Sequence, residues 1–332
     1  MSRRAWLGLW IAAAALIVPA AHLALGRGVD WSELLAGTDT VSWRVLTELR
    51  LPRLVVALFA GTALGLAGLA LQSVLRNPLA APELTAVNPS AVLGYLIASG
   101  TGLIDGGSVF SSVLSATVGG LLGGGLLWLV AHLRTSEQTA VLGLLSALAL
   151  TGVVTILIAA RPTGVGGALR WLIGSVEARV AEHVPMIAIP VLAGFAALVL
   201  VADRLEILAV SDSHAHCLGV SPGFWRGVGI GIAVLLASAA VATVGPLAFV
   251  GFVAPHVVRL VFGGRLRRQV VLVAVCGGLF VAASDLIAKA VSLAIQLTGD
   301  GQQVGVPVGA VTCLIGAAAL VAVASSHQES EP

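Results

Sequence analysis

One stretch of this chain limits its fold more than any other. The residues between Arg53 and Leu75 carry no charge, and a helix of that length, rising about 1.5 Å per residue, crosses a hydrocarbon core of about 30 Å. Small residues at Gly61, Gly65 and Gly68 would let a neighbouring backbone approach one face of this helix. The stretch therefore predicts a membrane-spanning helix in close contact with another helix.

The two ends of this stretch are polar. Arg50-Leu-Pro-Arg53 precedes it, and the proline-broken run Asn77-Pro-Leu-Ala-Ala-Pro82 follows it. Non-helical backbone near a membrane is tolerated only where protein buries it or water reaches it. We therefore expect a pair of cations at one membrane surface and an irregular turn near the other.

The composition extends this prediction to the whole chain. Of the 332 residues, 58% are hydrophobic and only 10% are charged, whereas soluble domains have about a quarter charged residues. The basic residues are scattered, which argues against nucleic-acid binding. The only lysine, Lys289, is not in a Gly-Lys-Ser/Thr loop, so a Walker-type nucleotide site is not expected. The composition indicates an all-α, polytopic membrane helix bundle.

Apolar runs and polar breaks predict about ten transmembrane helices in a single domain covering residues 1–332, with both termini cytoplasmic. Residues 1–5 form the cytoplasmic amino terminus, 203–226 a cytoplasmic loop and 326–332 a cytoplasmic tail. The expected spans are approximately 5–25, 51–75, 85–103, 109–131, 139–160, 185–202, 227–244, 247–262, 269–288 and 307–325.

Three cations would lie at the outer surface on this topology. Arg50 and Arg53 precede the second span and Lys289 follows the ninth. Such a cation cluster suits an acidic partner surface, because ion pairs across an interface set orientation and encounter rate. The alternative is snorkelling or anchoring to lipid headgroups.

The turn that follows the second span would lie on the cytoplasmic side. Two copies of the chain facing each other could close an axial path with Asn77, Pro78 and Leu79. The alternative is an ordinary connecting loop.

The loop 203–226 is the place where a cytoplasmic partner would dock. We expect Asp212–Leu218 to form a short helix that Gly219 ends, and Pro222 to begin another short turn. His214 and His216 stand two residues apart near Cys217, but such a pair would not share a helix face, so a metal site is not predicted.

His256 and Asp285 are ionisable residues inside apolar spans. Such residues are functional candidates by default. Asp285 stands four residues before Lys289, so the spacing favours an ion pair between them on one helix face. No nucleophile–base pairing indicates an enzyme.

These motifs, taken in order, resemble one family. Arg50-Leu-Pro-Arg53, the three glycines, Gln72 and Asn77–Pro82 are similar to the start of the FecCD-type permeases of bacterial ABC importers for iron chelates and cobalamin. The resemblance continues through Trp171-Leu-Ile-Gly-Ser175, Ala215-His-Cys-Leu-Gly-Val220, Gly245-Pro-Leu-Ala-Phe-Val-Gly-Phe-Val-Ala-Pro-His256, Ser284-Asp-Leu-Ile-Ala-Lys289 and Val306-Pro-Val-Gly-Ala-Val-Thr312.

The resemblance implies a cobalamin-importer-like fold in the bacterial inner membrane. It implies a second permease copy, identical or paralogous, two ATPase subunits that hold ATP and Mg²⁺, and a periplasmic or lipid-anchored substrate-binding protein. No cofactor would be bound by this chain.

The resemblance also assigns roles. Arg50, Arg53 and Lys289 would receive acidic residues of the binding protein, with lysine where the family more usually has arginine. Asn77 and Leu79, with Pro78 between them, would form the cytoplasmic gate. The ATPase would contact the loop around Asp212, His214, Ala215, Leu218 and Gly219, with His214 in place of the family's usual acidic residue.

The resemblance leaves the cargo open, with ferric siderophore first and haem or cobalamin next. An ion-coupled secondary transporter is the alternative function. It would use internal repeats and a buried ion site, and the sequence indicates neither of these. Dependence of uptake on a separate ATPase discriminates between the two.

Overall fold

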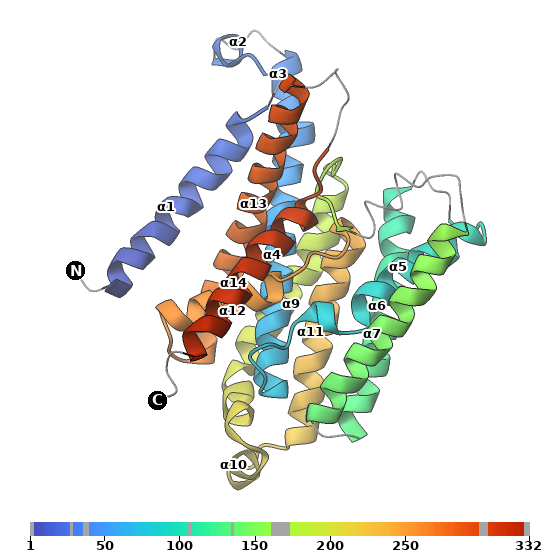
Figure 1. Ribbon diagram of the computed structural model, residues 1–332, viewed down its shortest axis with the longest axis vertical. Helices are drawn as coiled ribbons and strands as arrows, with labels where there is room; N and C mark the ends of the chain where they lie inside the picture. Colours follow the sequence, from blue (N-terminus) through green and yellow to red (C-terminus); the bar gives the residue numbers. More distant parts are fainter. Residues whose placement is uncertain are drawn as a thin grey trace.

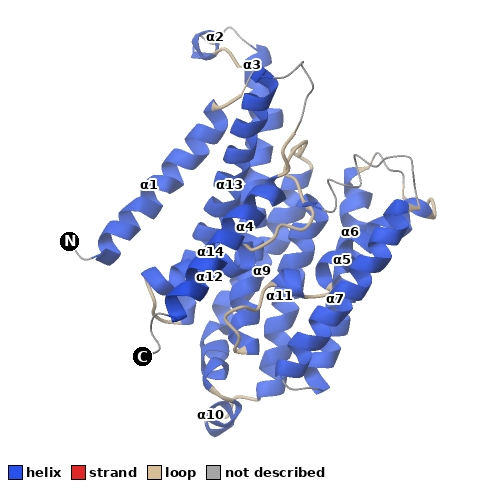
Figure 2. Cartoon of the chain, viewed as in Figure 1, coloured by secondary structure: helices blue, strands red, loops and turns tan. Residues whose placement is uncertain are grey.

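The computed structural model describes residues 3–26, 29–35, 40–104, 108–133, 136–160, 173–298 and 305–328, and all regular structure within them is helical (Figure 2). The main helices are α1 Arg3–Ala24, α4 Leu51–Leu75, α5 Val87–Gly100, α6 Val109–Leu133, α7 Ser136–Ala159, α9 His183–Val210, α11 Pro222–Val244, α12 Val250–Val261, α13 Leu266–Thr298 and α14 Val308–Gln328. The shorter elements are α2 Trp31–Leu35, α3 Thr40–Arg44, the π-helical turn η1 Val45–Arg50, the 3₁₀ turn η2 Pro82–Leu84 and α10 Asp212–Cys217.

The bundle is built around α4 and α11. Helices α9, α12 and α13 pack against α4, and α5 to α7 form a group on one side with α6 against α11 (Figure 1). Helix α1 leans on the opposite edge and contacts mainly α13. We call the end that carries α2 and α3 the upper end and the end that carries α10 the lower end.

Glycines explain how closely α4 meets its neighbours. A Cβ on Gly61 would overlap the carbonyl of Gly277 on α13, and one on Gly68 would overlap the carbonyl of Gly251 on α12. Only glycine leaves room for a backbone at that distance. The predicted small-residue face of the second span is therefore confirmed.

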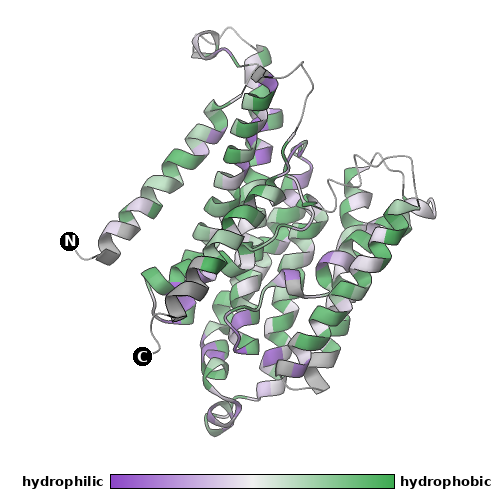
Figure 3. Ribbon diagram, viewed as in Figure 1, coloured by the Kyte–Doolittle hydropathy of each residue, from purple (hydrophilic) through white to green (hydrophobic). Residues whose placement is uncertain are grey.

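Six helical stretches among the described residues are long and apolar enough to cross a membrane: 41–75, 109–129, 141–159, 183–210, 222–244 and 266–296. Shorter apolar helical stretches cover 8–24, 250–261 and 308–321. Hydrophobic residues dominate the helices between the two ends (Figure 3). The structure confirms a polytopic membrane helix bundle, and the count of ten spans stays a prediction.

The helical segments that contain α4 and α13 are longer than the predicted spans. Helical backbone precedes Arg50 without a break, because the π-helical turn η1 leads directly into α4 and Pro52 sits in its first turn, where a missing N–H costs little. Helix α13 continues nine residues past Lys289 to Thr298, so the predicted end of the ninth span at residue 288 was wrong.

The predicted loop 203–226 is also mostly helical. Residues 203–210 are the last two turns of α9, and Pro222 begins the long helix α11 instead of a short turn. Proline suits that first position because its N–H would have no intrahelical partner there. The short helix α10 forms as predicted, and Gly219 follows it with a φ of 71°.

Candidate functional site

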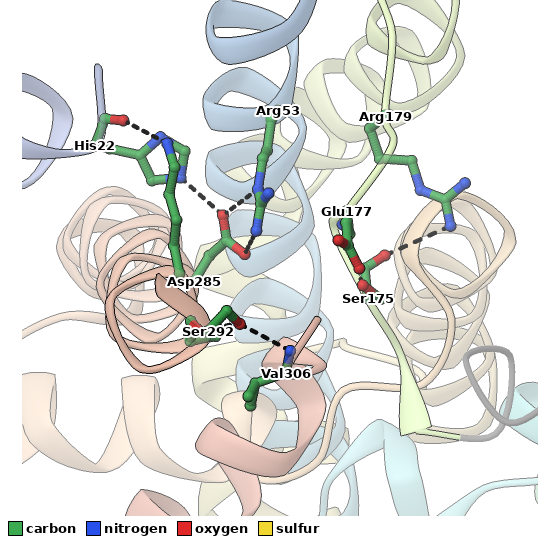
Figure 4. Close-up of polar contacts among 10 residues, drawn as sticks. His22, Arg53, Ser175, Glu177, Arg179, Asp285, Ser292 and Val306 are labelled. Carbon is green, nitrogen blue, oxygen red and sulfur yellow. Dashed lines mark hydrogen bonds and ion pairs between the residues drawn. The ribbon is translucent and has the colours of Figure 1, made fainter. Parts of the chain in front are cut away.

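A buried carboxylate organises the upper end of the bundle. Asp285 on α13 accepts hydrogen bonds from Arg53 Nε and Nη2, both at 2.8 Å, and its Oδ2 lies 2.7 Å from Nε2 of His22 on α1 (Figure 4). Asp285 is 1% exposed and His22 is fully buried. Three helices thus meet at one carboxylate through charge-assisted hydrogen bonds, which are stronger than neutral ones.

The ion pair predicted between Asp285 and Lys289 was wrong. Asp285 pairs with Arg53, and Lys289 Nζ instead donates to the carbonyl of His22 at 3.1 Å. The close glycine contact between Gly61 and Gly277 explains this, because Arg53 and Asp285 each lie eight residues above it on antiparallel helices. The arginine fork then matches the carboxylate with two bonds, which a lysine cannot do.

Arg50 lies beside this cluster but has a different set of partners. Its Nη1 donates to the carbonyls of Leu23 at 2.5 Å and Ala24 at 3.3 Å, and the residue is only 5% exposed. The last carbonyls of a helix have no intrahelical donor and attract cations. Arg50 and Lys289 therefore hold the end of α1 against the bundle.

A polar cavity of about 320 Å³ opens next to the cation cluster. Arg53 and Lys289 line it together with Glu177, which lies across from Arg53 in Figure 4. Further lining comes from Gly26, Ser292, Leu293, Gln296, Gly305 and Val306. The structure thus brings all three predicted cations together, but only Arg53 and Lys289 line the cavity.

The turn at the lower end of α4 is compact. The Asn77 side-chain oxygen accepts from the amide of Leu79 at 2.9 Å, and its carbonyl accepts from the amide of Ala80 at 3.0 Å. Asn77, Pro78 and Leu79 are exposed, with Leu79 at 50%, whereas Ala80 is buried. We call Asn77–Leu79 the inner turn. Its own hydrogen bonds hold it in a defined turn.

The chain after the inner turn packs under α12. Pro82 lies close to Gly251, and Glu83 lies in η2 with both carboxyl oxygens shielded from solvent. Burial raises the pKa of Glu83 to about 7, while the backbone amides of Phe249 and Gly251 act in the opposite direction. Because burial disfavours a charge, this carboxyl titrates near neutral pH.

Helix α10 lies at the extreme lower end of the molecule (Figure 1). The Ser211 side chain accepts from the amide of His214 at 3.0 Å, which caps the helix. Ala215 is fully buried and holds the helix to the bundle, while His214, Leu218 and Gly219 are exposed. Asp212 faces Arg76 and Arg226 and bonds to both.

A model of the FecCD transport family matches residues 9–326. The chain belongs to the FecCD transport family. It is 37% identical to the Fe(3+) dicitrate transport system permease protein FecD of Escherichia coli strain K12 over 297 residues, which cover 87% of this chain and 88% of that one. It is 34% identical to the ferric enterobactin transport system permease protein FepG of the same organism, over 83% of this chain and 81% of the relative.

A solved structure shares the fold of this chain. A metal-chelate type ABC transporter in an inward-facing conformation superposes with a TM-score of 0.83 at 23% identity, covering 96% of this chain and 98% of that chain. This FecCD protein is thus a multi-pass transport permease of the cell membrane.

Several residues of these sites were missed by sequence reasoning. His22 interrupts the apolar run 5–25, and an ionisable residue in such a run is a signal that could have identified it. Arg76 and Arg226 flank the two predicted lower sites, but nothing in their spacing along the sequence indicates that they share Asp212. Of the family motif Trp171–Ser175, residues 171 and 172 lie outside the described part of the chain.

Proposed function

We propose that this chain is the permease subunit of an ATP-driven importer and that it moves an iron chelate into the cytoplasm. The observation that carries the proposal is the family match over residues 9–326 together with similarity to permeases named for ferric dicitrate and ferric enterobactin. A ferric siderophore is the first candidate for the cargo, and haem and cobalamin are the next.

The chain does no chemistry in this proposal. Two separate ATPase subunits bind ATP and Mg²⁺, and they dock on α10 and the turn after it, where His214, Leu218 and Gly219 are exposed. A second permease copy, identical or paralogous, completes the path. The exposed inner turn, with Leu79 at its tip, closes that path on the cytoplasmic side.

A substrate-binding protein delivers the cargo at the upper end. An ammonium group has three donors, and the bond from Lys289 to His22 uses one of them. An acidic side chain of the binding protein can therefore enter the cavity and reach Lys289 beside Arg53. Arg50 supports this contact indirectly, because it is buried against α1.

Proteoliposomes test the proposal. They would hold the chain with the ATPase encoded beside it, and the neighbouring binding protein would be added loaded with ferric siderophore, haem or cobalamin. We expect one loaded form to stimulate ATP hydrolysis and uptake. Failure of the chain to associate with any ATPase, with uptake driven by an ion gradient, would instead establish a secondary transporter.

The docking contact has its own control. Lys289→Glu should abolish stimulation by the binding protein, and changing an acidic residue on the binding protein to lysine should restore it. A purely structural role of Lys289 at the end of α1 could not be rescued by a change in another protein.

A further inference from the structure

Asp212 joins the lower ends of three helices at one carboxylate. It is the first residue of α10, and its Oδ1 accepts from Nη2 of Arg76, the residue that ends α4. Nη2 of Arg226, in the first turns of α11, donates to Oδ1 at 3.0 Å and Oδ2 at 3.2 Å. Arg76 also donates from Nε to the carbonyl of Leu208 on α9 at 3.1 Å.

Arg76 stands directly before the inner turn. Its φ of 51° and ψ of 33° place it in the left-handed region, which residues with a Cβ adopt only against a steric cost. Its side chain is held at two points, by Leu208 and by Asp212. The direction in which the chain leaves α4 and enters Asn77 is therefore fixed by contacts with α9 and α10.

The two arginines differ in their exposure to solvent. The Arg226 side chain is 9% exposed and the Arg76 side chain is 29% exposed, while the Asp212 side chain is 48% exposed. Half-exposed ion pairs add little stability on their own. A carboxylate that bridges two guanidinium groups on different helices instead fixes their relative position.

We propose that Asp212 is the positioning residue through which movement of α10 reaches the inner turn. This inference rests on the proposed function, in which an ATPase moves α10. A displacement of α10 carries Asp212 with it, and Arg76 follows because its guanidinium is bonded to that carboxylate. Since Asn77 is the next residue, the inner turn moves with Arg76.

A local role for Asp212 gives a different expectation. A carboxylate in the first turn of a helix also interacts favourably with the helix dipole. If Asp212 only stabilised α10 in this way, its replacement would act independently of Arg76. A double-mutant cycle separates these two roles, because residues that act through one contact are not additive.

The experiment measures substrate molecules transported per ATP hydrolysed in the reconstituted complex, with co-purification of the ATPase as the check on assembly. The variants are Asp212→Asn, Arg76→Gln, the double variant and the conservative Asp212→Glu. Asp30→Asn is the matched control, because it makes the same chemical change at an exposed position just before α2, at the upper end and outside this cluster.

We expect each single variant to lower the ratio by about 2- to 30-fold, the range that coupling residues produce. The double variant should be no worse than either single one, Asp212→Glu should recover part of the ratio, and Asp30→Asn should match the wild type. Additive losses, or single variants with a wild-type ratio, would overturn the inference. A wild-type complex without ATP-dependent uptake would overturn the proposed function itself, and it would show this before any variant is compared.

Discussion

The buried carboxylate of Asp285 makes a sharp prediction about stability. Asp285→Asn preserves the shape of the side chain but removes the charge that Arg53 and His22 share. Removing one partner of a buried ion pair costs about 3–5 kcal/mol, because the other charge stays buried and uncompensated. The Arg53 side chain is 20% exposed, so solvent offsets part of this loss, and we expect about 2–3 kcal/mol.

The free energy of unfolding can be measured by titrating the purified chain with a denaturing detergent in mixed micelles and following its helical circular dichroism. Ser284→Ala is the control, because Ser284 is buried on the same helix but bonds only to the carbonyl of Phe280 within it. That change should cost less than about 1 kcal/mol.

A double-mutant cycle identifies the source of the loss. Asp285→Asn and Arg53→Gln together should be less damaging than the sum of the two single changes, with an interaction energy of about 1–3 kcal/mol. An Asp285→Asn variant within 0.5 kcal/mol of the wild type, or strict additivity with Arg53→Gln, would refute the reasoning. It would mean that the contact orients side chains without stabilising the bundle.

Three further predictions follow from other contacts. Gly68→Ala should lower the free energy of unfolding by about 1–3 kcal/mol or more, since its Cβ would overlap Gly251. Gly152→Ala is the control, because Gly152 has open space around it, and this change should be neutral or stabilising in the same detergent titration. Because the folded-state pKa of Glu83 is raised from 4.5 to about 7, the folded state binds the proton more tightly. Stability should therefore fall by up to about 1.4 kcal/mol per pH unit between these values and level off above them, and Glu83→Gln should remove that slope in unfolding titrations across pH. Arg50→Gln should free the carbonyls of Leu23 and Ala24 and make hydrogen exchange in the last turns of α1 roughly tenfold faster, with α11 unchanged as the internal control.

The sequence was sufficient for features that depend on local physics. Uncharged length predicted the spanning helices, the three glycines predicted the close face of α4, and Gly219 predicted the end of α10. Each of these follows from residues near in sequence, because membrane thickness, backbone approach and left-handed φ values act on one segment at a time.

Partner choice could not be predicted in the same way. Spacing along α13 favoured Lys289 as the partner of Asp285, but Arg53 is brought there from another helix 232 residues away in sequence. The decisive cause is the register between α4 and α13, which the contact between Gly61 and Gly277 sets. A single sequence shows where the glycines are, but it does not show which glycines of two helices contact each other.

The same register makes α4 the element that connects the two ends of the molecule. Its 25 residues span roughly 37 Å at about 1.5 Å per residue, with Arg53 bonded to Asp285 near the upper end and Arg76 bonded to Asp212 at the lower end. Between them, Gln72 donates to the carbonyl of Gly251 at 3.0 Å and accepts from Arg259, which ties α4 to α12.

A helix of this length is stiff along its axis, so a shift of α13 at the cation cluster and a shift of α10 at Asp212 both act on one rigid body. The glycine contacts with α13 and α12 leave few side chains to interlock, and small sliding motions of packed helices are a known form of switching. In the proposed function, docking at the upper end and movement of α10 at the lower end would thus both displace α4. The inner turn directly follows α4, so its position would change in response to either event.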